Sequence, residues 1–176
     1  MTMQCNAKTY TQICGIKNIQ CKDKGIERFL NDFCNKIQQH KLKCAIELCV
    51  CDNSACPQTQ SVVCGAGKSD IFDILIVQGI YKRNKCIKRY IEVEIKSIHS
   101  PKIYSRYDHM QEIINKFNYT CCDYTSSQRF LVPYLDLKLA KKIIKKLDKL
   151  LKKNRIQVML AEDFIKCIVK GEEKCS

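Results

Sequence analysis

The chain has 176 residues, of which 45% are hydrophobic, and it carries 31 basic against 18 acidic residues, a formal net charge of +13. This hydrophobic share predicts one folded domain with a sizeable core and excludes an intrinsically disordered chain. A charge surplus of this size predicts an anionic partner, and we expect nucleic acid before an acidic membrane surface.

The first residues, MTMQCNAKTY, contain no apolar stretch of the length found in signal peptides. No segment of the chain approaches the roughly 20 apolar residues that span a bilayer. We therefore expect a soluble protein of the cytoplasm, or of the host cell if the source is a virus, with no membrane partner.

Cysteine is unusually frequent, with 14 residues in a chain for which we expect no export signal. Disulfide-rich intracellular proteins occur in hyperthermophilic archaea, so we expect structural disulfides and an archaeal or archaeal-virus source. A second interpretation stays open for Cys49, Cys51, Cys56 and Cys64, which could hold zinc or an iron–sulfur cluster. Their spacing matches neither paired CxxC zinc motifs nor ferredoxin runs, so disulfides or buried thiols are favoured.

Apolar periodicity predicts the secondary structure in chain order. A single apolar stripe predicts a helix from Gly25 to about Lys43. Strands are then expected at 44–51, 69–78 and 89–97, with 79–88 as a basic turn or strand continuation. A second helix at 104–118, a strand at 129–135, a lysine-rich helix from 136 to about 153 and a short strand or turn at 156–164 complete the chain.

This element order predicts an α/β fold, a central mixed β-sheet flanked by helices. We expect residues 1–176 to form one domain. Its core would span about 25–135, and the basic helix and short strand would follow at 136–176.

The strand at 89–97 alternates charged and apolar residues, so Glu92, Glu94 and Lys96 share one face. Taken alone, this alternation is typical of a strand with a solvent-exposed charged face. The preceding strand changes the interpretation, because Asp73 lies within the apolar run IFDILIV, where a carboxylate is costly to bury without a partner.

If the two strands are neighbours, Asp73 and Glu94 converge and can bind Mg²⁺ or Mn²⁺ together with the main-chain carbonyl of Ile95. Lys96 would then orient or deprotonate the attacking water, or stabilise charge on a phosphate. Asp70 is the alternative first carboxylate, but it lies on the opposite face of a regular strand.

Asp73 followed by Glu94-Ile95-Lys96 resembles the D…(D/E)xK signature of the PD-(D/E)xK (restriction-endonuclease-like) nucleases. The element order is similar to their αβββαβ core. Glu27 matches an acidic residue on the first helix of archaeal Holliday junction resolvases. Gln111 resembles the glutamine of the RecB-like QxxxY motif, although Asn115 replaces the tyrosine. The usual proline before the aspartate is also replaced, by Phe72.

The resemblance implies a Mg²⁺- or Mn²⁺-dependent DNA endonuclease, selective for DNA structure and acting as a homodimer. Asp73, Glu94, Lys96, Glu27 and Gln111 would be its catalytic residues. The substrate backbone would be held by basic residues near the site in sequence, namely Lys82, Arg83, Lys85, Lys88, Arg89, Lys102 and Arg106.

Two alternatives remain, a non-catalytic nucleic-acid-binding module on the same fold and a nuclease-like protein with a cysteine-bound metal. The lysines of the helix at 136–155 are interpreted mainly as a solvated face, with phosphate contact as the alternative.

Overall fold

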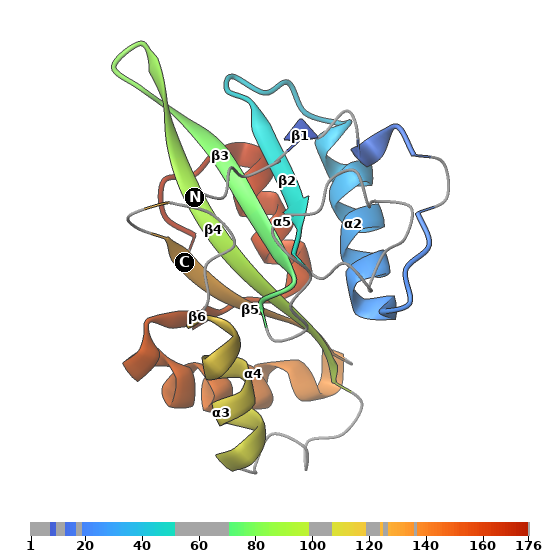
Figure 1. Ribbon diagram of the computed structural model, residues 1–176, viewed down its shortest axis with the longest axis vertical. Coiled ribbons are helices and arrows are strands. Elements are labelled where there is room, and N and C mark those ends of the chain that lie inside the picture. Colours follow the sequence, from blue (N-terminus) through green and yellow to red (C-terminus); the bar gives the residue numbers. More distant parts are fainter. Residues whose placement is uncertain are drawn as a thin grey trace, which may run out of the picture.

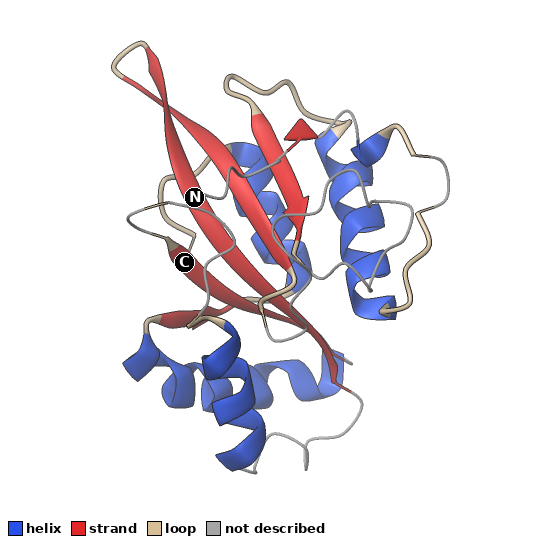
Figure 2. Cartoon of the chain, in the orientation of Figure 1, coloured by secondary structure: helices blue, strands red, loops and turns tan. Residues whose placement is uncertain are grey.

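The computed structural model describes residues 8–9, 13–16, 19–51, 71–98, 107–118, 124, 127–135 and 137–175. Its elements are arranged around one sheet (Figures 1 and 2). In chain order they are β1 (Lys8–Thr9), α2 (Lys24–Ile37), β2 (Ile46–Val50), β3 (Ile74–Lys82), β4 (Lys85–Ile98), α3 (Tyr107–Lys116), β5 (Gln128–Leu135), α4 (Leu137–Leu151), the 3-10 turn η3 (Lys152–Asn154), β6 (Ile156–Val158) and α5 (Ala161–Lys170).

The six strands among the described residues follow one another across the sheet in sequence order, from β1 to β6. Strands β1 to β4 pair antiparallel, whereas β4, β5 and β6 pair in parallel. Helices α3 and α4 form the crossovers that the two parallel pairs require. The predicted α/β class and mixed sheet are therefore confirmed.

Helices cover both faces of the sheet. On one face, Val93 and Ile95 of β4 pack in a cluster with Phe29 of α2 and Phe164 of α5. The opposite face forms a second cluster, in which β3 and β5 contact α3 and α4. Because both faces are covered, residues 91–95 of β4 are all buried. A solvent-exposed charged face on this strand, the simpler interpretation of its sequence, is wrong.

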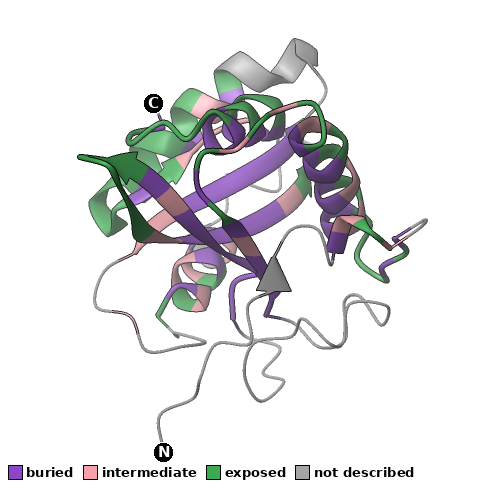
Figure 3. Ribbon diagram, turned by 90° about the horizontal axis from the view of Figure 1, so that it is seen from above, coloured by how far each residue is buried: buried purple, intermediate pink, exposed green. Residues whose placement is uncertain are grey.

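Strands β3 and β4 form a long hairpin that projects beyond the rest of the sheet (Figure 1). Its two turn residues, Arg83 and Asn84, both have positive φ, of 49° and 63°. Such a pair is the two-residue turn that matches the twist of hairpin strands. Residues 81–88 are exposed, which gives the green tip in Figure 3.

Several element boundaries differ from those predicted. Helix α2 ends at Ile37, six residues before Lys43, because its buried stripe ends there. β3 begins at Ile74 rather than at 69. Helix α5 was not predicted, although two acidic residues in its first turn and Gly171 at its C-terminus, with φ 69°, are helix-end signals.

Pro133 lies within β5 and does not end it. β5 continues to Leu135, and Pro133 pairs with Lys96 of β4. On the other side, β6 pairs only with residues 129–131. The missing N–H therefore falls where β5 has a partner on one side only, which is where a strand tolerates proline.

Disulfides join Cys14 to Cys34, Cys44 to Cys86 and Cys167 to Cys175. Cys21 and Cys49 are disulfide-bonded as well. The expected disulfides are thus confirmed. In this oxidised state the Cys49 sulfur is not a thiolate, the form that binds metals. Cys56 and Cys64 lie outside the described residues. The hypothesis that Cys49, Cys51, Cys56 and Cys64 bind a metal is therefore tested only at Cys49.

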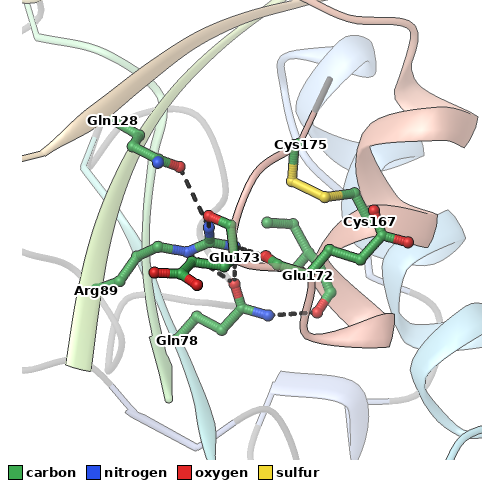
Figure 4. The surroundings of a disulfide bond; sticks show 8 residues. Gln78, Arg89, Gln128, Cys167, Glu172, Glu173 and Cys175 are labelled. Atoms are coloured by element: carbon green, nitrogen blue, oxygen red, sulfur yellow. Dashed lines mark hydrogen bonds between the residues drawn. A yellow bond between two sulfur atoms is a disulfide. The ribbon is translucent and has the colours of Figure 1, made fainter. Parts of the chain in front are cut away.

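The Cys167–Cys175 disulfide closes a C-terminal turn that is held against the sheet by Arg89 (Figure 4). The Arg89 guanidinium donates to the main-chain carbonyls of Glu172 and Glu173 and to the side-chain carbonyl of Gln78. Gln78 is buried and donates in turn to the carbonyl of Ile168. Arg89 is therefore a structural clamp between β4 and the chain end.

Replacing Arg89 with methionine should lower the free energy of unfolding by about 2 kcal/mol, because several acceptors lose a charged donor. The matched control is Lys82→Met, which removes only the exposed ion pair with Glu173. That variant should lose less than about 0.5 kcal/mol. Urea unfolding of both variants measures the difference, and equal losses would show that the clamp contributes no more than a surface ion pair.

Candidate active site

Asp73 and Glu94 lie opposite each other at one end of the β3–β4 pairing. Ile74 pairs with Val93, which places the preceding Asp73 beside Glu94. Asp73 Oδ2 accepts a hydrogen bond of 2.7 Å from the main-chain N–H of Ile95. Asp73 is 5% exposed and Glu94 is fully buried. The two strands therefore hold a buried pair of carboxylates, the convergence that the sequence predicted.

The pKa of Asp73 is raised well above its usual value. Burial is the main cause, and the negative charge of Glu94 adds to it. Lys116, the Ile95 N–H and Lys96 act in the opposite direction and do not compensate. Like charges that share a buried site favour neutralisation by a proton or a cation.

Glu94 uses only one of its two oxygens for hydrogen bonds. Its Oε1 accepts from Lys116 Nζ at 2.7 Å and lies 3.0 Å from Lys96 Nζ. Its Oε2 is buried and has no hydrogen-bond partner among the described residues. Buried polar atoms in native proteins nearly always have a partner. An unpaired carboxylate oxygen beside a second carboxylate therefore suits a hard cation, which prefers oxygen ligands.

Ile95 offers a third oxygen at the same place. In a strand, the N–H and the C=O of one residue point to the same side. The Ile95 N–H points to Asp73, so its carbonyl faces the side of β4 on which Asp73 lies. A cation here would have two side-chain ligands, because no three His, Cys, Asp or Glu side chains gather anywhere in the described residues.

Lys96 faces the acidic pair, with 29% of its side chain exposed. Burial is the largest single influence and lowers the pKa of Lys96, but the charge and hydrogen bond of Glu94, together with the charges of Asp73 and Glu112, outweigh it. The net effect is a raised pKa, so Lys96 is an ammonium at neutral pH. In this state it stabilises negative charge rather than accepting a proton from water.

Lys116, in the last turn of α3, was not predicted as a site residue. Only 17% of its side chain is exposed, and its ammonium forms the shortest ion pair with Glu94. The sequence held a partial signal, because Lys116 lies between the core residues Ile113 and Phe117 on the helix. The crossover between β4 and β5 determines which strand residue this flank of α3 contacts. The pattern of apolar residues in the helix does not predict that crossover.

Two of the predicted catalytic residues make other contacts. Glu27 accepts from the Cys21 N–H at 2.7 Å and from Lys24 Nζ at 2.9 Å. The hydrogen bond from Lys24 is the main reason that the pKa of Glu27 is lowered. Its helix α2 packs on the face of the sheet opposite Glu94. Gln111 is half-buried and donates a hydrogen bond to Asn115 within α3.

Glu92 shares a face with Glu94 but has its own partners. It is fully buried and accepts from Arg129 Nε at 3.0 Å and from Tyr124 Oη at 2.5 Å. Burial raises the pKa of Glu92, and these hydrogen bonds and the Arg129 charge oppose the shift. Glu92 is therefore part of a neutralised structural ion pair, not a solvated side chain and not a free ligand.

The basic residues predicted to lie near the site are mostly distant from it. Lys85 precedes Glu94 by nine residues on β4, which at ~3.3 Å per residue is about 30 Å. Of the hairpin cations, Lys82 pairs with Glu173 and Lys88 lies 4.0 Å from Glu47. Arg89 is held in the C-terminal clamp, and Arg83 and Lys85 are exposed at the hairpin tip. Lys102 and Arg106 lie outside the described residues.

Comparison of the chain with protein-family models, with curated proteins and with solved structures finds no match. In the part of the chain that the structure describes, no helix is long and apolar enough to cross a membrane.

Proposed function

We propose that the protein is a metal-dependent nuclease that hydrolyses phosphodiester bonds in DNA. The observation that supports this function best is the buried pair of Asp73 and Glu94, with Glu94 Oε2 unpaired and Lys96 facing both carboxylates. The element order from α2 through β2, β3, β4 and α3 to β5 also supports the proposal, because it is similar to the αβββαβ core of the restriction-endonuclease-like fold.

In this proposal Asp73, Glu94 and the Ile95 carbonyl hold a Mg²⁺ or Mn²⁺ ion. Such a cation polarises a phosphodiester and lowers the pKa of a bound water. The ammonium groups of Lys96 and Lys116 stabilise negative charge on the phosphate. They act from a largely buried position, where charge interactions are stronger than in water.

The direct test is cleavage of labelled linear, single-stranded and four-way-junction DNA with Mg²⁺ or Mn²⁺. Wild type should cleave at least one substrate, and the preferred substrate defines the subclass. Glu94→Ala should lose cleavage by more than about a hundredfold, because several kcal/mol of transition-state stabilisation are removed. Glu162→Ala, an exposed residue in the first turn of α5, is the matched control. Cleavage by Glu94→Ala at the wild-type rate would refute the proposal.

A second candidate is a non-catalytic nucleic-acid-binding module on the same fold. It is favoured by one observation, the two ammonium groups on Glu94 Oε1. Together Lys96 and Lys116 balance the charges of the two carboxylates. In such a module Lys116 would take the place of a catalytic cation.

The variant Lys116→Met separates the two candidates. For a nuclease, Mn²⁺ already raises the melting temperature of wild type, and loss of the neighbouring ammonium strengthens the response because like charges repel. For a non-catalytic module, wild type shows no Mn²⁺ response and only the variant gains one. Thermal unfolding with and without millimolar Mn²⁺ distinguishes these results.

A further inference from the structure

The positive charge of the chain is concentrated in one segment. Residues 137–155, which form α4, η3 and Arg155, contain eight lysines and one arginine against a single acidic residue, Asp148. Nine cations less one anion give +8, out of +13 for the whole chain. The charge that predicts an anionic partner is therefore mainly the charge of this segment.

Seven of these cations are described with their side chains, and all seven are exposed. We call Lys142, Lys145, Lys146, Lys149, Lys152, Lys153 and Arg155 the α4 basic face. Within the described part of the chain, none of them forms an ion pair. The hairpin differs, because its Lys82 and Lys88 have acidic neighbours and its Arg89 is bound within the molecule.

The apolar side of α4 is already covered. Ile143, Leu147 and Leu151 are buried in the same cluster as Phe72 and Phe117. An amphipathic helix binds a membrane by inserting its apolar face. Among the described residues of α4, Leu150 is the only exposed large hydrophobic side chain, so this part of the helix presents no continuous apolar face. Phe72 precedes Asp73 and Phe117 follows Lys116, so α4 belongs to the same layer as the candidate site.

The composition of this face fits a phosphate backbone rather than unstacked bases. Residues 137–155 contain no aromatic side chain, although proteins that bind single strands stack bases on aromatic rings. From Lys142 to Lys153 the face extends about 16 Å at 1.5 Å per residue, which is about half a helical turn of B-DNA. Lysines in such a row suit the regular phosphates of a duplex.

We propose that the α4 basic face is the surface on which the protein binds duplex DNA, in place of the β3–β4 hairpin. This inference rests on the proposed function only for the identity of the partner, DNA. It does not require cleavage at Asp73 and Glu94. DNA binding by the α4 basic face and nuclease activity can therefore be refuted separately.

The test compares Lys142→Gln/Lys145→Gln/Lys149→Gln with the hairpin variant Lys82→Gln/Arg83→Gln/Lys85→Gln. Each removes three exposed cations, and glutamine retains a high helix propensity on α4. The affinity for a labelled linear DNA duplex is measured in EDTA, from about 50 to 200 mM salt, where phosphate contacts dominate. Circular dichroism melting confirms that both variants are folded.

We expect the α4 variant to bind the duplex at least tenfold more weakly than wild type. The slope of log K against log salt concentration should become shallower by about 2 to 3, or about 0.9 for each lost phosphate contact. The hairpin variant should stay within about threefold of wild type. An α4 variant with wild-type affinity, or a larger loss in the hairpin variant, would overturn the inference. Binding of wild type to anionic vesicles but not to DNA would overturn it as well. Binding without cleavage would refute only the nuclease proposal.

Discussion

Asp73→Asn should raise the stability of the metal-free protein while it abolishes metal-dependent cleavage. The asparagine carbonyl still accepts from the Ile95 N–H, but the negative charge beside Glu94 is gone. Removal of an unfavourable buried charge should stabilise the fold by about 1–2 kcal/mol, or a few degrees in melting temperature. Cleavage should fall by more than about a hundredfold, because the proposed metal site would lose one of its ligands.

The stability gain should depend on pH in a defined direction. The pKa of Asp73 is raised in the folded state, so the folded protein holds this proton more tightly than the unfolded chain does. Wild type therefore has its full stability below the unfolded pKa of about 3.9 and loses part of it as the pH rises through the folded pKa. The advantage of Asp73→Asn should be absent near pH 3 and should grow toward neutrality.

Thermal melts in EDTA across this pH range measure both effects. The control is Asp163→Asn, an exposed residue in the first turn of α5, whose stability difference from wild type should not follow this profile. If Asp73→Asn were less stable than wild type at neutral pH, the Asp73 charge would be favourable in the fold, and the reason for expecting a cation there would fail.

Glu94→Gln should have the opposite effect on the metal-free protein, although it too should abolish cleavage. It leaves Lys96 and Lys116 beside a neutral amide, with 29% and 17% of their side chains exposed. Loss of one partner from a buried ion pair costs about 3–5 kcal/mol. Partial exposure allows both lysines to regain water, so we expect a loss of about 1–3 kcal/mol.

Urea unfolding in EDTA measures this loss. Glu47→Gln is the matched control, because Glu47 lies 4.0 Å from the exposed Lys88 and should contribute less than about 0.5 kcal/mol. The two site variants are most informative together. In the proposed site, Asp73→Asn stabilises the fold, Glu94→Gln destabilises it, and both abolish cleavage. If the two carboxylates only supported the fold, both substitutions would destabilise it.

The convergence of Asp73 and Glu94 was predictable because it depends on local patterns. A carboxylate within an apolar run and a strand with period-two alternation indicate adjacent strands that share a face. The β3–β4 hairpin then brings the two residues together, because strands joined by a short turn pair in a fixed register.

The contacts of Lys116 and Arg89 could not be predicted from local sequence patterns. The position of Lys116 depends on the parallel crossover from β4 through α3 to β5, which joins residues 22 apart in sequence. Arg89 is near Glu94 in sequence but lies on the other face of the strand, where the C-terminal turn covers it. Its proximity to Glu94 in sequence predicted a substrate-binding role for Arg89. The contacts of Arg89 depend instead on which face of β4 it occupies and on the C-terminal turn that covers this face.

Direct binding of Mn²⁺ to the folded protein, measured by isothermal titration calorimetry at neutral pH, tests the central claim that Asp73 and Glu94 form a divalent-metal site. We predict one saturable site in wild type that is lost in Asp73→Asn, with both proteins folded. No binding to wild type, or equal binding to the variant, would contradict the claim.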